Sequence, residues 1–187
     1  MKSMHQLTFR EVTNTTWPDF EALFDSRGAP HFCYCMVWRA QGVERKLKGE
    51  ARKASMAERV RSGTPVGILG YLDDKPIAWC SIAPRPTYRR LGGLEREGET
   101  PHDVWSLACF FIQREHRGEG FMAALIKAAI TTAKSHGAKV LEAYPVDPTA
   151  PSYRFMGFVP AFEALGFEHV AEAGNHRHVM QLRLAHT

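Results

Sequence analysis

The chain has 187 residues, of which 44% are hydrophobic and 24% are charged. This length and composition predict one globular domain over residues 1–187, long enough to bury a real core. The N-terminal segment Met1–Gln6 has no apolar stretch of the kind found in secretory signals, and no run approaches the ~18 apolar residues of a membrane span. We therefore expect a cytoplasmic protein with no membrane partner.

The formal net charge is +4, and the first third of the chain carries the excess. Residues 1–62 hold 11 lysines and arginines against 7 acidic residues, and the remaining residues hold 13 of each. Most of the excess lies in Val43–Lys53. This segment either attracts an anionic partner or forms the solvated face of a helix. The excess is small and no nucleic-acid-binding motif accompanies it, so nucleic acid is not an expected partner.

Four cysteines are present. Cys80 and Cys109 lie in apolar strand-like runs, which is typical of buried free thiols. Cys33-Tyr34-Cys35, with His31 nearby, raises the question of a metal site. Zinc sites usually have four ligands at recognisable spacing, and no second cysteine pair occurs, so we predict no metal site.

The first third of the chain predicts one strand and two helices. Leu7–Val12 alternates like a short strand. A helix is expected from Thr16, as its cap, to about Arg27. Val43–Arg61 has the pattern of a second, basic helix.

The middle of the chain predicts a hairpin, a long loop and a buried strand. Val66–Leu72 and Lys75–Ala83 flank a short acidic turn, as in a β-hairpin. Pro84–Asp103 is a polar loop of a length that is often functional. Val104–Ile112 is continuously apolar, which indicates a strand buried on both faces.

The last third predicts two helices and three strands. Phe121–His136 is an apolar-rich helix and Lys139–Tyr144 a strand. Phe155–Leu165 has a helical pattern, and Phe167–Ala173 and His176–Leu184 are the closing strands. The resulting order, β-α-α-β-β-β-α-β-α-β-β, places antiparallel hairpins around one β-α-β crossover. We therefore predict an α/β fold of mixed type, with helices on both faces of the sheet.

The segment Arg117-Gly118-Glu119-Gly120-Phe121-Met122-Ala123 lies between the buried strand and the long helix. Glycine lets a backbone approach a ligand closely. The turn also presents free N–H groups, and the following helix adds its positive N-terminal end. Such a site suits the pyrophosphate of a nucleotide-like cofactor.

One interpretation of this turn is a dinucleotide site in an NAD(P)-dependent oxidoreductase. Gly118–Ala123 fits the pattern G-x-G-x-x-G/A, and Glu142 lies near the ribose-binding spacing. Three observations argue against a dinucleotide site. Residues 113–117 separate the strand from the glycine motif, hairpin strands precede the motif, and no repeating α/β units follow it.

The same residues resemble motif A of the GNAT superfamily of N-acetyltransferases, Arg/Gln-x-x-Gly-x-Gly/Ala. Here it reads Arg117-Gly118-Glu119-Gly120-Phe121-Met122, with Met122 in place of the small residue. The order of elements over Trp79–Phe167 is also similar to that of the family. The resemblance implies a central, mostly antiparallel mixed sheet of six to seven strands.

The resemblance implies acetyl-CoA as cosubstrate and acetyl transfer by direct attack of a primary amine. The pantetheine arm would pair with the backbone of Phe110, Phe111 and Ile112. The pyrophosphate would lie on the N–H groups from Arg117 to Ala123. The acceptor is expected to be a small-molecule or peptide amine, and a homodimer is compatible with the sequence.

The resemblance also implies a tyrosine acid before the final Glu-x-x-Gly-Phe, where this chain has Phe162. Tyr153 and Tyr144 are the candidate replacements. Glu142, which shares a strand face with Tyr144, is the candidate base, with Asp103 and His102 as alternatives. If no acid replaces the tyrosine, the alternative function is a non-catalytic acyl-CoA-binding module.

The acceptor site implied by the resemblance is formed by three segments, His31–Trp38, the basic helix and the loop Arg85–Asp103. Its aromatic wall would consist of Trp38, Tyr34 and Tyr88, although such residues also commonly fill a core.

Overall fold

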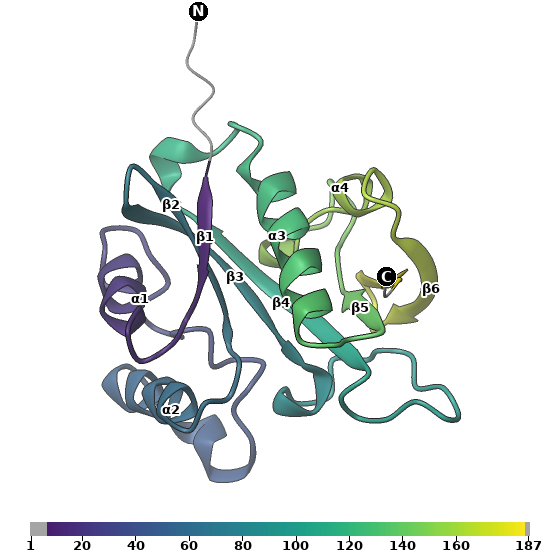
Figure 1. The fold of residues 1–187 in the computed structure, drawn as a ribbon, viewed down its shortest axis with the longest axis horizontal. Coiled ribbons are helices and arrows are strands. Elements are labelled where there is room, and N and C mark those ends of the chain that lie inside the picture. Colours follow the sequence, from purple (N-terminus) through teal and green to yellow (C-terminus); the bar gives the residue numbers. More distant parts are fainter. Residues whose placement is uncertain (1–6, 186–187) are drawn as a thin grey trace, which may run out of the picture.

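The structure is a computed structural model that describes residues 7–185. Its strands form one seven-stranded sheet in the order β1-β2-β3-β4-β5-β7-β6 (Figure 1). The strands are β1 (Thr8–Glu11), β2 (Gly67–Leu72), β3 (Lys75–Pro84), β4 (Val104–Ile112), β5 (Val140–Ala143), β6 (Glu168–Ala173) and β7 (Arg177–Arg183). Within the described chain, β4 and β5 are the one parallel pair of neighbours. The prediction of a mostly antiparallel mixed sheet is confirmed.

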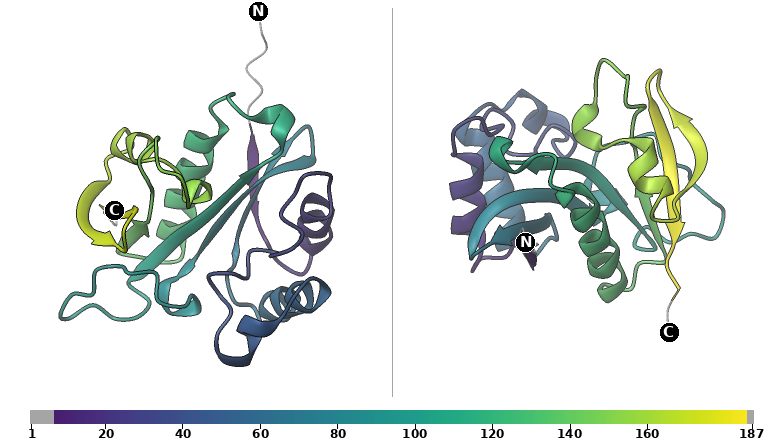
Figure 2. Two further views of the ribbon diagram at one scale, coloured as in Figure 1. Left: turned by 180° about the vertical axis from the view of Figure 1, so that it is seen from behind. Right: turned by 90° about the horizontal axis from the view of Figure 1, so that it is seen from above.

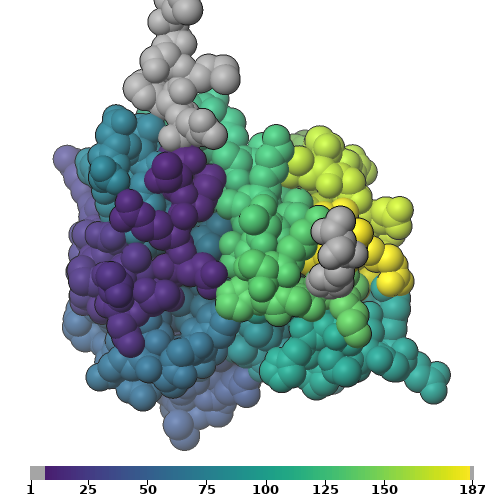
Figure 3. Space-filling model, in the orientation of Figure 1, coloured from purple at the N-terminus to yellow at the C-terminus, as the bar shows by residue number. Residues whose placement is uncertain are grey.

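Helices cover both faces of this sheet, as predicted (Figure 2). One face carries α1 (Trp17–Phe24) and α2 (Glu50–Arg61), and the other carries α3 (Phe121–Ser135) and α4 (Val159–Glu163). In the space-filling view, α3 fills the front of the molecule between the N-terminal third and the C-terminal segments (Figure 3). Its buried side chains are Phe121, Leu125, Ile126, Ala129 and Ala133, and they pack in one hydrophobic cluster with residues of β3 and β4.

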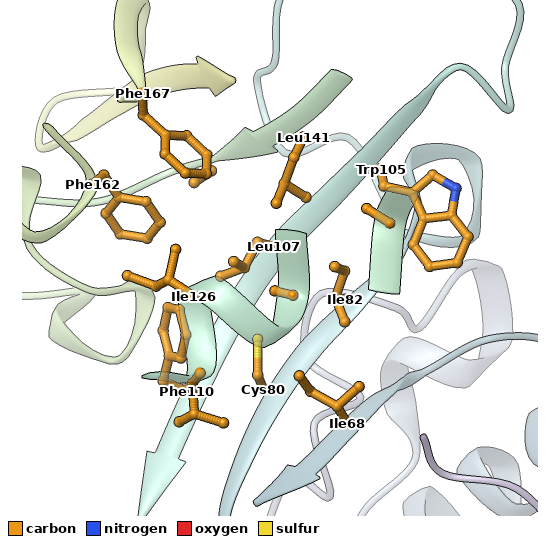
Figure 4. Packing of buried hydrophobic residues seen from close by; sticks show 14 of the residues in the cluster. Ile68, Cys80, Ile82, Trp105, Leu107, Phe110, Ile126, Leu141, Phe162 and Phe167 are labelled. Carbon is orange, nitrogen blue, oxygen red and sulfur yellow. The ribbon is translucent and has the colours of Figure 1, made fainter. Parts of the chain in front are cut away.

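The larger hydrophobic cluster lies between the sheet and α3 (Figure 4). Phe162 is fully buried there, with its ring centroid 5.1 Å from that of Phe167 and 6.2 Å from that of Phe110. The residue at the position of the family's tyrosine acid is therefore a core side chain with no proton to give.

Two predicted helices are each broken by a glycine with a positive φ. Val43–Arg61 divides into a short 3-10 turn, η1 (Gly42–Lys46), and α2, because Gly49 has φ +48°. Phe155–Leu165 divides into η4 (Arg154–Met156) and α4, because Gly157 has φ +89°. Few other residues tolerate this conformation, so the chain changes direction there. The first helix also ends earlier than predicted, at Phe24.

Three of the seven lysines and arginines in residues 43–61 form ion pairs: Lys53, Arg59 and Arg61. Lys53 of α2 lies 3.2 Å from Glu21 and 2.9 Å from Asp25, and so ties α2 to α1. Arg59 pairs with Glu44 at 2.9 Å. These contacts give part of this charge a structural role. Among the described residues, no helix is long and apolar enough to cross a membrane.

Candidate active site

The centre of the sheet opens where β4 and β5 separate. The two strands pair in parallel from Val104 and Val140 to Leu107 and Ala143. β4 then continues to Ile112, with no β5 ladder beside it in the described chain. A strand edge of this kind presents unpaired N–H and C=O groups that an extended ligand can use.

A β-bulge lies at the point of separation. Ser81 of β3 faces Cys109 and Ile82 faces Leu107, so Ala108 is an extra residue of β4. A bulge leaves its extra residue out of the ladder and is common beside active sites. The backbone of Ala108 therefore faces neither neighbouring strand in register.

The glycine turn lies beyond the end of β4 and opens α3. Gly118 and Gly120 have φ +83° and +81°, and a Cβ at either position would lie in open space. Arg117 donates from Nε to the carbonyl of Ile112 at 2.9 Å, which ties the turn to β4. The turn joins β4 to α3 where the sequence places it, and its binding of a pyrophosphate stays a prediction.

One cavity of about 1160 Å³ runs from this turn along the end of β4. Typical small-molecule sites measure ~300–1,000 Å³, so it can hold an extended cosubstrate. Eight of the ten predicted cosubstrate-binding residues line it: Phe110, Phe111, Ile112, Arg117, Gly118, Gly120, Phe121 and Met122. Glu119 and Ala123 do not, and their contact with a ligand stays a prediction.

The rest of the cavity wall comes largely from the segment before η1 and from η4 with the residue before it. Phe32, Tyr153 and Phe155 form an apolar rim, with exposed fractions of 65%, 37% and 43%. Trp38 and Val37 lie in the same wall. Among the described residues that line the cavity, none is an aspartate or a glutamate.

Tyr153 is the one predicted catalytic residue in the described cavity wall. Its backbone has φ +57°, an unusual conformation for a non-glycine residue. Its ring centroid lies 6.2 Å from that of Trp38, and the Arg177 guanidinium carbon lies 5.3 Å from the tyrosine ring. These contacts hold the phenol at the cavity wall.

Glu142 and Tyr144 share a strand face, as predicted, but the structure does not place them in the cavity wall. Both are fully buried, and the Tyr144 hydroxyl donates to Glu142 Oε1 at 2.6 Å. Ser106 is 2.7 Å from the same hydroxyl. Burial first, and then the charge of Glu142, raises the pKa of Tyr144 well above its usual range.

Glu142 anchors the long loop 85–103. It accepts hydrogen bonds from the Leu94 N–H at 3.1 Å and from Gln181 Nε2 at 2.7 Å, and it lies 3.6 Å from Arg85. Gly93 approaches so closely that a Cβ there would overlap the carboxylate. Catalytic roles for Glu142 and Tyr144 stay predictions, and their contacts are those of a structural network.

The other acceptor-side predictions fall outside the large cavity. Tyr34 donates to Asp25 at 2.7 Å, and Tyr88 is buried against Arg39. The loop 85–103 lines a second hollow of about 570 Å³, and neither the loop nor α2 contributes to the first. Asp103 pairs with Lys139 at 3.1 Å, and neither it nor His102 lines the described cavity.

Three cysteines line the cavity: Cys33, Cys35 and Cys109. Sequence reasoning treated them as buried thiols or as a rejected metal motif. Within residues 7–185, the one group of three close metal-ligating side chains is elsewhere, at His169, Glu172 and His178 of the β6–β7 hairpin. Fully buried Arg39, beside Cys35, was not singled out, although an arginine four residues after a cysteine was a usable signal.

Residues 9–158 match the family model for the acetyltransferase (GNAT) family. The chain therefore belongs to the GNAT family of acetyltransferases. It is an acyl-CoA-dependent acyltransferase whose cosubstrate is acetyl-CoA.

Solved structures show the same fold. The chain is similar to yncA from Salmonella typhimurium, solved with its cofactor acetyl-CoA, at 18% identity and a TM-score of 0.59, over 97% of this chain and 95% of that one. It is also similar to the GNAT domain of S. lividans PAT, at 16% identity and a TM-score of 0.60, over 95% and 90%. A GCN5-related N-acetyltransferase from Kribbella flavida matches at 19% identity and a TM-score of 0.58, over 97% and 100%. No curated protein matches the chain.

Proposed function

We propose that this protein transfers the acetyl group of acetyl-CoA to the primary amine of an apolar acceptor. The observation that carries the proposal is one continuous cavity that joins the free edge of β4 to the glycine turn. Acetyl-CoA is an extended thioester with phosphates at one end. It needs a strand edge for its extended arm and, in line with it, a turn for its phosphates. Apolar side chains of Phe32, Val37 and Phe155 line the same cavity.

Each part of acetyl-CoA has a matching element of the site. The N–H groups of the turn and the start of α3 suit the pyrophosphate, and Arg117 adds positive charge there. The pantetheine amides suit the β4 edge at Phe110–Ile112. Ala108, out of register at the bulge, offers a backbone N–H to the acetyl carbonyl as negative charge develops on its oxygen.

Tyr153 is the proposed acid that protonates the departing CoA thiolate. Its support is its place in the wall of the cavity that the end of β4 also lines. Phe162, in the core, cannot do this. Glu142 as base remains a prediction without support from the cavity, since its oxygens are occupied by Leu94, Gln181 and Tyr144.

The acceptor class follows from the chemistry of the wall. With no carboxylate among the described lining residues, the cavity has nothing to bind a polycation such as a polyamine or an aminoglycoside. Exposed Phe32 and Phe155 instead favour an aryl or alkyl amine, or the end of a hydrophobic peptide.

A second candidate function is a non-catalytic acyl-CoA-binding module, which Phe162 favours. Release of CoA from acetyl-CoA across a panel of amines separates the two. We expect turnover with apolar amines and little with polyamines. Binding of acetyl-CoA without turnover on any amine would favour the module.

Binding is tested with a matched pair of glycine variants. Gly120→Glu places a carboxylate in the pyrophosphate cradle, whereas Gly137→Glu creates similar backbone strain at the other end of α3, at φ +78° and in open space. At ~100 times its dissociation constant, acetyl-CoA should stabilise the parent and Gly137→Glu by about 2.7 kcal/mol. Gly120→Glu should gain nothing. Equal stabilisation of both variants would place the phosphate site elsewhere.

A further inference from the structure

The β6–β7 hairpin, at one edge of the sheet, brings together three side chains of the kinds that bind metal ions (Figure 1). They are His169, Glu172 and His178, and each offers a ligand atom within 4.8 Å of those of the other two. None of the three lines the cavity at the end of β4. The cluster is therefore separate from the acetyl-CoA site described above.

A β-bulge puts these side chains on one face of the hairpin. In a regular strand, residues three apart point to opposite faces, so His169 and Glu172 would be separated. Their partners on β7 are Met180 and His178, which are two residues apart and so share a face. On β6, Val170 is the extra residue that restores the match. The bulge also explains why the sequence contains no recognisable ligand spacing.

The carboxylate of Glu172 lies between the two imidazoles. Its Oε1 is 2.8 Å from His169 Nε2 and 3.0 Å from His178 Nδ1. Zinc bonds of ~2.0–2.1 Å hold tetrahedral ligand atoms roughly 3.3 Å apart, so small rotations of these side chains would seat an ion among the three atoms. Two imidazoles and one carboxylate suit Zn²⁺, with a fourth position left for water.

Asp147 makes the outer contact that metal-binding histidines usually have. Its Oδ1 is 3.2 Å from His178 Nε2, the ring nitrogen that does not contact Glu172. Metal-bound histidines typically donate their second N–H to a carboxylate or a carbonyl, which fixes the tautomer and the orientation of the ring. With Nε2 directed at Asp147, Nδ1 of His178 is the nitrogen that is left for the metal.

A hollow of about 270 Å³ beside the hairpin gives an ion access to this cluster. Its wall includes Asp147, Glu172 and His178. The side chains of His169 and Glu172 are 48% and 57% exposed, and that of His178 is 23% exposed. A site with three protein ligands and this exposure differs from the closed, four-ligand sites of structural zinc, and it can exchange its ion with solution.

We propose that His169, Glu172 and His178 bind one Zn²⁺ ion, with Asp147 as the carboxylate that orients His178. A bound ion joins β6 to β7 and, through Asp147, to the loop after β5, so it stabilises this edge of the sheet. The proposal replaces the expectation of no metal site, which rested on the cysteine motif alone. It does not depend on the proposed acetyl transfer, because it uses none of the residues of the large cavity.

The experiment titrates ZnCl₂ into the metal-free full chain at pH ~8, where free imidazoles are neutral, and follows binding by calorimetry. We expect one ion per chain with a dissociation constant below ~100 μM. Saturating zinc should also raise the Tm, because the ion binds only the folded arrangement of the three ligands. A parent that shows no saturable binding in this range would overturn the proposal.

Three variants at the site are compared with one control. His178→Ala and Glu172→Gln each remove a ligand and should abolish zinc binding and the rise in Tm. Asp147→Asn removes only the outer carboxylate and should weaken binding by about tenfold. His136→Ala is the control, because His136 also lies 2.9 Å from a carboxylate, that of Glu11, but belongs to no group of three ligands within residues 7–185.

The control should bind zinc like the parent. The Tm of each variant without metal shows that it is folded, and Glu172→Gln, which keeps the size and shape of the side chain, tests the site even if His178→Ala does not fold. A folded Glu172→Gln variant that binds zinc as tightly as the parent would overturn the site. So would loss of the ion in His136→Ala.

Discussion

Two buried polar clusters lie at the two sides of the sheet centre, and they differ in how their charges are compensated. The first surrounds Glu142, whose carboxylate has three hydrogen-bond donors and nearby Arg85. The second surrounds Arg39, whose guanidinium has neutral oxygens and the sulfur of Cys35. The first cluster is closed to the large cavity, and the second opens into it through Cys35.

The difference between the two clusters shows how this fold uses its buried charged side chains. A carboxylate with all of its partners in place is stable and unreactive, and it serves to hold the loop 85–103. A buried guanidinium that donates to the carbonyls of Cys35 and Val66 and to the Tyr88 hydroxyl ties these three segments of the chain together. The same low-dielectric interior therefore holds a loop anchor on one side and a support for the cavity wall at Cys35 on the other.

The largest effect is expected from breaking the closed cluster. Glu142→Ala leaves Arg85, Gln181 and the Tyr144 hydroxyl without their acceptor, and removing one partner of a buried ionic network typically costs about 3–5 kcal/mol. Urea unfolding measures the loss. Glu119→Ala is the control, because Glu119 is half exposed and should change stability by less than about 0.5 kcal/mol.

The same variants decide between the structural role of Glu142 and its predicted role as a base. If Glu142→Gln keeps most of the parent's stability and still loses turnover without losing acetyl-CoA binding, Glu142 acts in the chemistry. We expect instead that stability and turnover fall together.

The next largest effect is expected at Tyr153 in the cavity wall, with Tyr144 of the closed cluster for comparison. Tyr153→Phe should lower kcat at least ~tenfold, or about 1.4 kcal/mol in the barrier, because only the proton donor for the CoA thiolate is removed. Acetyl-CoA affinity should change little. Steady-state kinetics and a binding titration give the two numbers separately.

Tyr144→Phe is the paired control within the closed cluster. It should cost about 1–3 kcal/mol of stability, because Glu142 and Ser106 lose a hydrogen-bond partner, and it should leave kcat near the parent's value. A reversed result, with kcat falling only in Tyr144→Phe, would move the acid into the closed cluster.

The sequence predicted the sheet, the faces of its helices and the glycine turn, because these depend on local patterns. Continuous apolar residues in Val104–Ile112 and glycines at 118 and 120 are readable without tertiary contacts. The breaks at Gly49 and Gly157 were missed because a single glycine within a helical pattern is compatible with a continued helix.

The site was less predictable because it depends on long-range packing. Glu142 and Tyr144 were correctly placed on one face, but their enclosure requires Leu94 and Gln181, which are 48 and 39 residues away along the chain. Cys35 and Arg39 are local to each other, yet burial of the arginine and the approach of Cys109 are tertiary facts. A charge that lacks a carboxylate partner is visible only once the whole neighbourhood is known.

The smallest effect concerns a third ionic cluster, which is solvent-exposed and so measures what burial adds to the other two. His178 lies 3.2 Å from Asp147 and 3.0 Å from Glu172. Burial alone would lower the pKa of His178, but the hydrogen bonds to Asp147 and Glu172 outweigh it and raise the pKa. A raised folded-state pKa adds stability that is fully present below the unfolded value of ~6.5 and is lost as the pH rises through the folded pKa.

The free energy of unfolding of the parent should therefore exceed that of His178→Gln by up to about 1 kcal/mol near pH ~6, and by less at pH ~8. Denaturant unfolding at the two pH values measures the difference, and 1 M salt should shrink it because the partners are exposed. A difference that grows with pH would show that neutral His178 packs in the hairpin and that its ion pairs contribute nothing.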